Sequence, residues 1–192
     1  RSAWGNKGGP VTPEMVVNER KASAGSKTMW TADELLKLHP HPGSEDKTDR
    51  IHHLISYDYE GKIKSLAEMR KTKPVAVEEE QGGIISLKQA GNKKDFFGMA
   101  WEGEVVAPRS GDYRFRLDSD DGAAVFINGK PVVAVKGIGG MGRQQEGRTL
   151  LEKGRHKIRI EYFEHTGVEG ICLSWRGPKF GREFFLSDQK TG

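Results

Sequence analysis

Hydrophobic and polar residues alternate along most of the second half of the chain. In residues 111–119 the apolar side chains are Tyr113, Phe115 and Leu117, and arginines stand between them. A repeat of two puts successive side chains on opposite faces of a strand, so this segment predicts an antiparallel strand with one buried face. Further strand-like segments are found at residues 51–61, 82–90, 96–108, 155–165 and 170–178.

A hairpin is predicted over residues 123–135. The pair Asn128-Gly129 stands there between two apolar runs. Asn-Gly is the preferred pair of a type I′ turn, because both central residues of that turn need a positive φ. The chain is therefore expected to reverse its direction at this pair.

Many short strands with little helix between them predict an all-β fold, either an antiparallel β-sandwich or a closed barrel. We expect this domain to cover residues 51–180, with Trp101, Trp175 and Cys172 in its core. One or two helical turns are predicted within residues 64–71. Residues 181–192 are predicted to be a C-terminal tail.

The first fifty residues have a different character from the rest. They are rich in turn-forming glycine, proline and serine, and we interpret residues 1–50 as an irregular arm or linker. One short helix is predicted inside the arm at residues 31–39, where Thr31 and Glu34 have the spacing of a capping box.

The composition and net charge of the chain argue against two kinds of partner, nucleic acids and membranes. The chain has 192 residues with 31 Lys and Arg against 27 Asp and Glu, a formal net charge of +4, and no basic run. Nucleic-acid binding favours a basic stripe, so we expect no nucleic-acid partner. No apolar run approaches the ~20 residues that cross a membrane, so membrane insertion is not expected. The chain begins without Met, and we interpret it as a piece of a longer protein.

Three aspartates crowd the end of the strand predicted at 111–119. They are Asp118, Asp120 and Asp121, and Gly122 follows them. Carboxylates can bind Ca²⁺, which takes about six to eight oxygen ligands. Adjacent residues of an extended strand point to opposite faces, however, and Gly129 stands where an EF-hand loop needs its closing Glu. The residues alone therefore favour a solvated turn over a cation site.

Other chemical motifs are weaker. His52 and His53 would face opposite sides of a strand, which does not suit the converging ligands of a zinc site. The glycine-rich run at 137–142 leads into a strand, whereas a dinucleotide-binding loop opens a helix. Cys172 has no electropositive neighbours in sequence that would activate its thiol. We therefore expect no catalytic residues, and the protein is not predicted to be an enzyme.

Several motifs that follow one another in the second half of the chain resemble a known family. They are "WEGEVVAPRSGDYRF", the "SDDG" turn, the "ING" hairpin, "LEKGRHKI" and the pair "YFE" and "LSW", between about residues 57 and 178. Together they resemble the protective-antigen domain, or PA-fourteen domain, family. The resemblance implies a β-sandwich-like barrel of secreted and surface proteins whose commonest activity is carbohydrate binding. An extracellular, cell-surface or periplasmic location is the matching expectation.

The resemblance also implies a binding site. In sugar-binding adhesin members of the family, adjacent aspartates of the acidic turn are joined by a cis peptide bond and hold a Ca²⁺ ion that binds sugar hydroxyls. The matching metal ligands here are Asp120 and Asp121, and the implied cofactor is Ca²⁺. Those adhesins complete the site with an Asn from the loop between the last two long strands, whereas the loop at 164–170 contains none. That loop offers three other candidates: Glu164, His165 and Glu169.

Two functions are weighed on this basis. The first is a non-catalytic carbohydrate-binding module of a larger exported or cell-surface protein, which binds a glycan or polysaccharide directly or through calcium. Its expected binding residues are Asp120, Asp121, Glu164, His165 and Glu169. The alternative is a structural or protein–protein interaction module that docks or spaces neighbouring domains without a ligand. The arm at 1–50 and the missing Asn favour this alternative.

Overall fold

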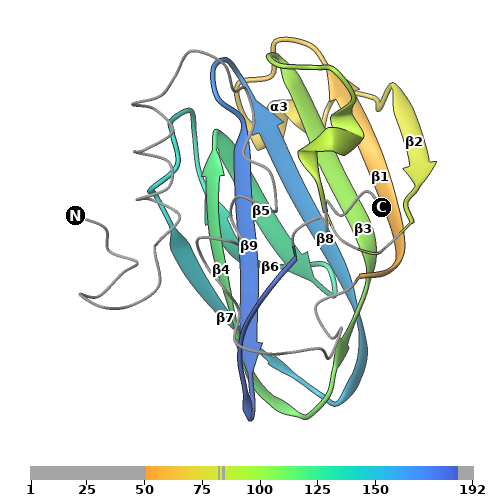
Figure 1. Cartoon of the computed structure of the whole chain (residues 1–192), viewed down its shortest axis with the longest axis vertical. Coiled ribbons are helices and arrows are strands. Elements are labelled where there is room, and N and C mark those ends of the chain that lie inside the picture. The colour runs from red at the N-terminus through yellow and green to blue at the C-terminus, as the bar shows by residue number, and fades with distance from the viewer. Residues whose placement is uncertain (1–50, 82, 84, 186–192) are drawn as a thin grey trace, which may run out of the picture.

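The computed structural model describes residues 51–81, 83 and 85–185, and it shows two antiparallel sheets packed against each other (Figure 1). The larger sheet has six strands in the spatial order β2 (Ala76–Glu79), β1 (His52–Glu60), β3 (Phe97–Ala107), β8 (Gly154–Glu164), β5 (Gly122–Ile127) and β6 (Lys130–Val135). The smaller sheet has four strands in the order β10 (Phe180–Phe184), β9 (Gly170–Gly177), β4 (Gly111–Asp120) and β7 (Gln145–Leu151). The predicted all-β fold class is confirmed.

Alternating side chains of both sheets build one core between them. Tyr113, Phe115 and Leu117 of β4 are fully buried there, as the repeat of two predicts. The ring of Trp175 on β9 lies 5.1 Å from Tyr113 and 5.7 Å from Phe115, between ring centroids. Trp101 of β3 completes the core from the other sheet, and each such side chain contributes about 1.5–3 kcal/mol by burial. Cys172 is buried beside this core, as expected for a small apolar residue.

The hairpin between β5 and β6 turns at the predicted pair. Asn128 has φ 51° and Gly129 has φ 77°, the two positive values that a type I′ turn requires. The backbone N–H of Asn128 donates to the carbonyl oxygen of Lys157 on the neighbouring strand β8. The hairpin is thereby held against the six-stranded sheet.

Residues 82–90, predicted to be a strand, are mostly not one. The segment Leu87–Ala90 forms a short 3₁₀-helix, η1. The side chain of Gln89 accepts a hydrogen bond from the backbone N–H of Ser86 at 3.0 Å, which closes a capping box. Local side-chain hydrogen bonds of this kind compete with strand pairing, and here they prevail.

The domain extends beyond the predicted boundary at residue 180. Strand β10 covers Phe180–Phe184 and pairs with β9, and Phe185 is buried. The ring of Phe185 lies 5.3 Å from that of Trp175. Sequence patterns do not predict this extension, because the apolar residues around Phe185 show no periodic pattern. The arm predicted at 1–50, its helix at 31–39 and residues 186–192 lie outside the described residues.

The outward face of the six-stranded sheet carries the short helix α3 (Leu66–Met69). This helix falls within the predicted segment 64–71, and Ser65 caps it by accepting a hydrogen bond from the N–H of Glu68 at 3.1 Å. Met69 packs with Tyr59 and Phe163 in a second, smaller apolar cluster under the helix. No helix in the described part of the chain has the length and apolarity needed to span a bilayer.

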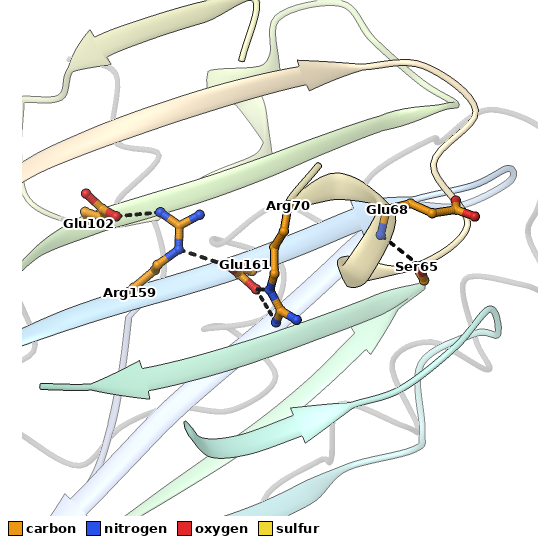
Figure 2. A network of polar contacts seen from close by, with 6 residues as sticks. All are labelled: Ser65, Glu68, Arg70, Glu102, Arg159 and Glu161. Carbon is orange, nitrogen blue, oxygen red and sulfur yellow. Dashed lines mark hydrogen bonds and ion pairs between the residues drawn. The ribbon is translucent and has the colours of Figure 1, made fainter. Parts of the chain in front are cut away.

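A chain of ion pairs ties α3 to the strands below it (Figure 2). Glu161 of β8 lies almost fully buried between two arginines. The guanidinium of Arg70 contacts one carboxylate oxygen of Glu161 at 2.6 Å, and that of Arg159 contacts the other at 2.9 Å. Arg159 also reaches Glu102 of β3 at 2.5 Å. The network therefore joins the residue that follows α3 to two strands of the six-stranded sheet.

Candidate functional site

The acidic stretch lies where the chain crosses from one sheet to the other. Strand β4 of the four-stranded sheet ends at Asp120, and strand β5 of the six-stranded sheet begins at Gly122. Asp120 is paired with Gly170 of β9, and Gly122 is paired with Phe163 of β8. The peptide bond between Asp120 and Asp121 is cis. The two aspartates are thus placed at one end of the sandwich, next to the loop that joins β8 to β9.

Three carboxylates converge at this end. Asp120, Asp121 and Glu164 each offer an oxygen within 4.8 Å of the others, and all three residues are buried. Glu164 is the last residue of β8, so its position is fixed by the six-stranded sheet. The carboxyl group of Glu169 is also buried and lies close enough to raise the pKa of Glu164. The described residues therefore form a concentrated cluster of buried carboxyl groups.

Asp121 joins the two loops that flank the carboxylates. One of its carboxylate oxygens accepts a hydrogen bond from the N–H of Gly139 at 2.7 Å. The other accepts from the N–H of His165, also at 2.7 Å. The loops 136–144 and 164–170 are consequently held at fixed positions on either side of this residue.

Asp118 anchors the glycine-rich loop and is not part of the convergent group. Its carboxylate accepts hydrogen bonds from the N–H groups of Gly142 at 2.8 Å and Arg143 at 3.0 Å. Burial raises the pKa of Asp118 to about 6, although these hydrogen bonds act in the opposite direction. Asp118, Asp120 and Asp121 are all buried, so the prediction of a solvated turn is wrong. The loop folds back over the aspartates and excludes water from them.

The side chain of Arg143 stabilises the loop 136–144 through hydrogen bonds to backbone carbonyl groups. Its guanidinium donates to the carbonyl oxygens of Asp121 and Gly139, both at 2.7 Å. It also donates to the carbonyl oxygens of Lys136 at 2.9 Å and Gly140 at 3.0 Å. One side chain thus satisfies several carbonyl groups that would otherwise lie buried without a donor.

The pKa of the Glu164 carboxyl group is strongly raised. Burial, together with the charges of Asp121 and Asp120, raises its pKa to about 9. The hydroxyl of Tyr162 lies 2.9 Å from its Oε2 and donates to the carbonyl oxygen of Asp120 at 2.5 Å. Within the described residues, nothing hydrogen-bonds the other oxygen, Oε1, which is buried. A buried acceptor in an acidic cluster is satisfied by a proton, an ordered water molecule or a cation.

The other candidates of the loop 164–170 contribute differently. His165 donates its backbone N–H to Asp121, while its ring packs edge-on against Phe96 at 5.2 Å. Glu169 is buried near Glu164 at the start of β9. The structure therefore brings Asp120, Asp121 and Glu164 together, with Glu169 beside them, and gives the imidazole of His165 a packing role.

Comparison with known proteins agrees with this arrangement of strands. The family described as the PA14 domain matches residues 55–184, which is more than half of the chain. The chain belongs to the PA14 domain family. The resemblance drawn from the sequence motifs is thereby confirmed.

Individual relatives of this PA14 domain are distant. The anti-sigma-I factor RsgI3 of Acetivibrio thermocellus is 26% identical over 97 residues, which cover 50% of this chain and 15% of that protein. The PA14 sugar-binding domain of an RTX adhesin has a TM-score of 0.55 at 19% identity, over 70% of this chain and 95% of that one. An anti-sigma factor domain-containing protein has a TM-score of 0.56 at 20% identity, over 73% and 47%. The solved structures show the shared fold, and the chain spans only a small part of the curated relative.

The raised pKa of Glu164 predicts how the stability of this PA14 domain depends on pH without divalent cations. The folded state keeps a proton on Glu164 up to about pH 9, whereas the unfolded state releases it near the ordinary glutamate pKa of 4.5. The free energy of unfolding should therefore fall as the pH rises, by about 2 kcal/mol between pH 6.5 and 8.5. Chemical denaturation in a chelator measures this change.

Two variants control that measurement. Glu164→Gln cannot titrate and should remove the pH dependence between pH 6.5 and 8.5, whereas the partly exposed Glu104→Gln should leave it unchanged. A Glu164→Gln protein with the wild-type pH dependence would contradict the prediction.

The sequence indicated some of these residues and not others. Asp120, Asp121 and Glu164 were candidates because of their position in the family motifs. The anchoring roles of Asp118 and Arg143 were missed, since they depend on how the loop 136–144 folds back over β4. The only signal in the sequence was the glycine-rich character of that loop, which allows its backbone N–H groups to approach a carboxylate closely.

Proposed function

We propose that this PA14 domain is a non-catalytic carbohydrate-binding module that binds Ca²⁺ through Asp120, Asp121 and Glu164 and sugar hydroxyls beside it. The observation that carries the proposal is the convergence of three buried carboxylates, one of which, Glu164, has a buried oxygen, Oε1, with no hydrogen-bond partner among the described residues. Similarity to a PA14 sugar-binding domain of an adhesin supports the choice of ligand.

The donor set suits calcium. Ca²⁺ prefers hard oxygen ligands, and carboxylates are its strongest protein ligands. Glu164, at the end of β8, borders the loop from which a neutral Asn would come in the related adhesins, so a bound calcium ion would be held by a third carboxylate. When bound, Ca²⁺ supplies coordination positions for vicinal hydroxyl groups of a sugar. The protein's part is to hold the carboxylates converged, which Tyr162 and the two anchored loops accomplish.

The proposal also covers the protein to which this module belongs and the partners of the module. A module of this kind belongs to a larger exported or cell-surface protein, and its partners are a glycan and the neighbouring domains. No acid–base or nucleophilic role is assigned to the carboxylates, because their proposed task is to hold the ion and hydroxyl groups.

Calorimetric titration with Ca²⁺ tests the cation site. Asp120→Asn should weaken calcium binding by about a hundredfold, because it removes one charged ligand and keeps the side chain's size. Asp112→Asn is the matched control on the same strand, since its carboxylate pairs with surface arginines, and it should bind calcium like the wild type.

A glycan array with and without chelator tests the second half of the proposal. We expect binding that is lost in chelator and in the Asp120→Asn variant. Absence of both calcium and glycan binding would overturn the proposal and leave the domain-spacing or docking role.

A further inference from the structure

The outward face of the four-stranded sheet carries a row of arginines. In the strand register, Arg114 of β4 lies directly opposite Arg148 of β7 on one side and Arg176 of β9 on the other. The three strands lie side by side in Figure 1. Like charges placed directly opposite each other destabilise a sheet, so this row is not explained by the pairing of the strands.

Acidic residues on this face neutralise only part of the charge. Arg116 adds a fourth guanidinium, and the carboxylates are Asp112 and Glu146. Asp118 and Asp120, further along β4, are buried, so among the accessible described side chains on this face of β7, β4 and β9 four positive groups stand against two negative groups and leave two positive charges. Glu146 is shared by Arg114, Arg116 and Arg176 at 3.4, 3.5 and 3.7 Å, so one carboxylate serves three guanidiniums.

The opposite sheet shows that such an excess is not a general property of the domain. Its outward network pairs Arg70 and Arg159 with Glu102 and Glu161, two charges of each sign (Figure 2). On the four-stranded sheet the arginines are also more accessible, with 65% of the Arg148 side chain and 45% of the Arg176 side chain exposed. The positive excess is therefore concentrated on one accessible surface.

We infer that this arginine face, formed by Arg114, Arg116, Arg148 and Arg176, binds a polysaccharide that carries carboxylate groups, one built from uronic acid residues. The planar guanidinium suits a carboxylate, with which it forms two parallel hydrogen bonds. Asp112 and Glu146 already make carboxylate contacts with these arginines, so carboxylates of a ligand would meet donors of matching chemistry. Neighbouring strands lie about 4.8 Å apart, so the row offers guanidiniums at regular intervals to a repeating anionic polymer.

The arginine face lacks two features with which proteins bind nucleic acids, so a polysaccharide is favoured over a nucleic acid as its ligand. The described side chains on the outward side of β7, β4 and β9 include no aromatic ring, and single-stranded nucleic acids are held by stacking on such rings. A flat sheet face also has no element that would enter the groove of a duplex. The inference is independent of the calcium site, because it uses different residues and needs no cation.

Binding of the whole chain to polygalacturonate, in chelator and at low ionic strength, tests the inference. We expect binding to the de-esterified polymer, no binding to the fully methyl-esterified polymer, and weaker binding as salt is added. The double variant Arg148→Gln with Arg176→Gln should bind about tenfold more weakly, the loss expected for two exposed ion pairs. Glu146→Gln should bind more tightly, because a competing carboxylate is gone.

Two controls accompany these measurements. Arg155→Gln, on the other sheet and similarly exposed, should bind like the wild type. Binding measured in chelator should be the same as binding measured with added Ca²⁺, which separates this surface from the proposed calcium site. Equal binding of the methyl-esterified polymer, an unaffected double variant or equally tight binding of duplex DNA would each overturn the inference.

Discussion

Replacing Glu161 by alanine should lower the free energy of unfolding by about 1.5–3 kcal/mol, the range for hydrogen bonds to a charged group, because both arginines that remain are partly exposed. The side chain of Glu161 is 3% exposed and is contacted by both Arg70 and Arg159 (Figure 2). Its loss removes the contact that joins Arg70 to β8, while Arg159 keeps its ion pair with Glu102. Urea denaturation followed by tryptophan fluorescence measures the change.

The pair Arg155 and Glu104 on the same sheet provides the control for this prediction. The Arg155 side chain is 55% exposed, and exposed pairs contribute about 0–1 kcal/mol. Glu104→Ala should therefore change the stability by less than about 1 kcal/mol. Equal losses in the two variants would show that the network does not stabilise α3 and the sheet through its buried charge.

A single methyl group at Gly147 should destabilise the domain by about 3 kcal/mol, the upper range for overpacking. A Cβ atom there would collide with the carbonyl oxygen of Val132 on β6 and lie 2.8 Å from the Cβ of Val133. The obstacle is mostly backbone, so it cannot be relieved by a change of rotamer. Gly147 lies where strand β7 of one sheet passes strand β6 of the other.

The thermal unfolding temperature of Gly147→Ala checks this expectation against Gln145→Ala. Gln145 lies on the same strand and is exposed, so its replacement should have little effect. A Gly147→Ala protein as stable as the wild type would mean that β6 and β7 can move apart without loss of packing.

The sequence predicted the strands better than the contacts between them. Alternation such as that of Tyr113, Phe115 and Leu117 reports directly on which face of a strand is buried, and the strand register follows from it. The Asn128-Gly129 turn was equally clear, because few residue pairs adopt its dihedral angles. Such local rules do not predict the burial of Phe185. Its ring packs against Phe115 and Trp175, which lie on two different strands, β4 and β9.

The candidate site was predictable only in part for the same reason. Alternation along a strand would separate Asp120 from Asp121, and family motifs were needed to join them. The third carboxylate belongs to Glu164, which lies 42 positions after Gly122 in the sequence. Its approach to the aspartates therefore depends on the topology of the whole sandwich. The burial of Asp118 depends on the folded loop 136–144, whose glycines have no periodic pattern to read.

Strand β10 and Phe185 have a mechanical consequence. A force applied at the C-terminal side of the domain reaches β10 first, and β10 forms a hairpin with β9. The hydrogen bonds of a hairpin that is pulled from its open end break one after another, so the strand would peel away at low load. Before it does, the ring of Phe185 must leave the rings of Trp175 and Phe115. We therefore expect this aromatic contact to resist the first step of unfolding from the C-terminal side.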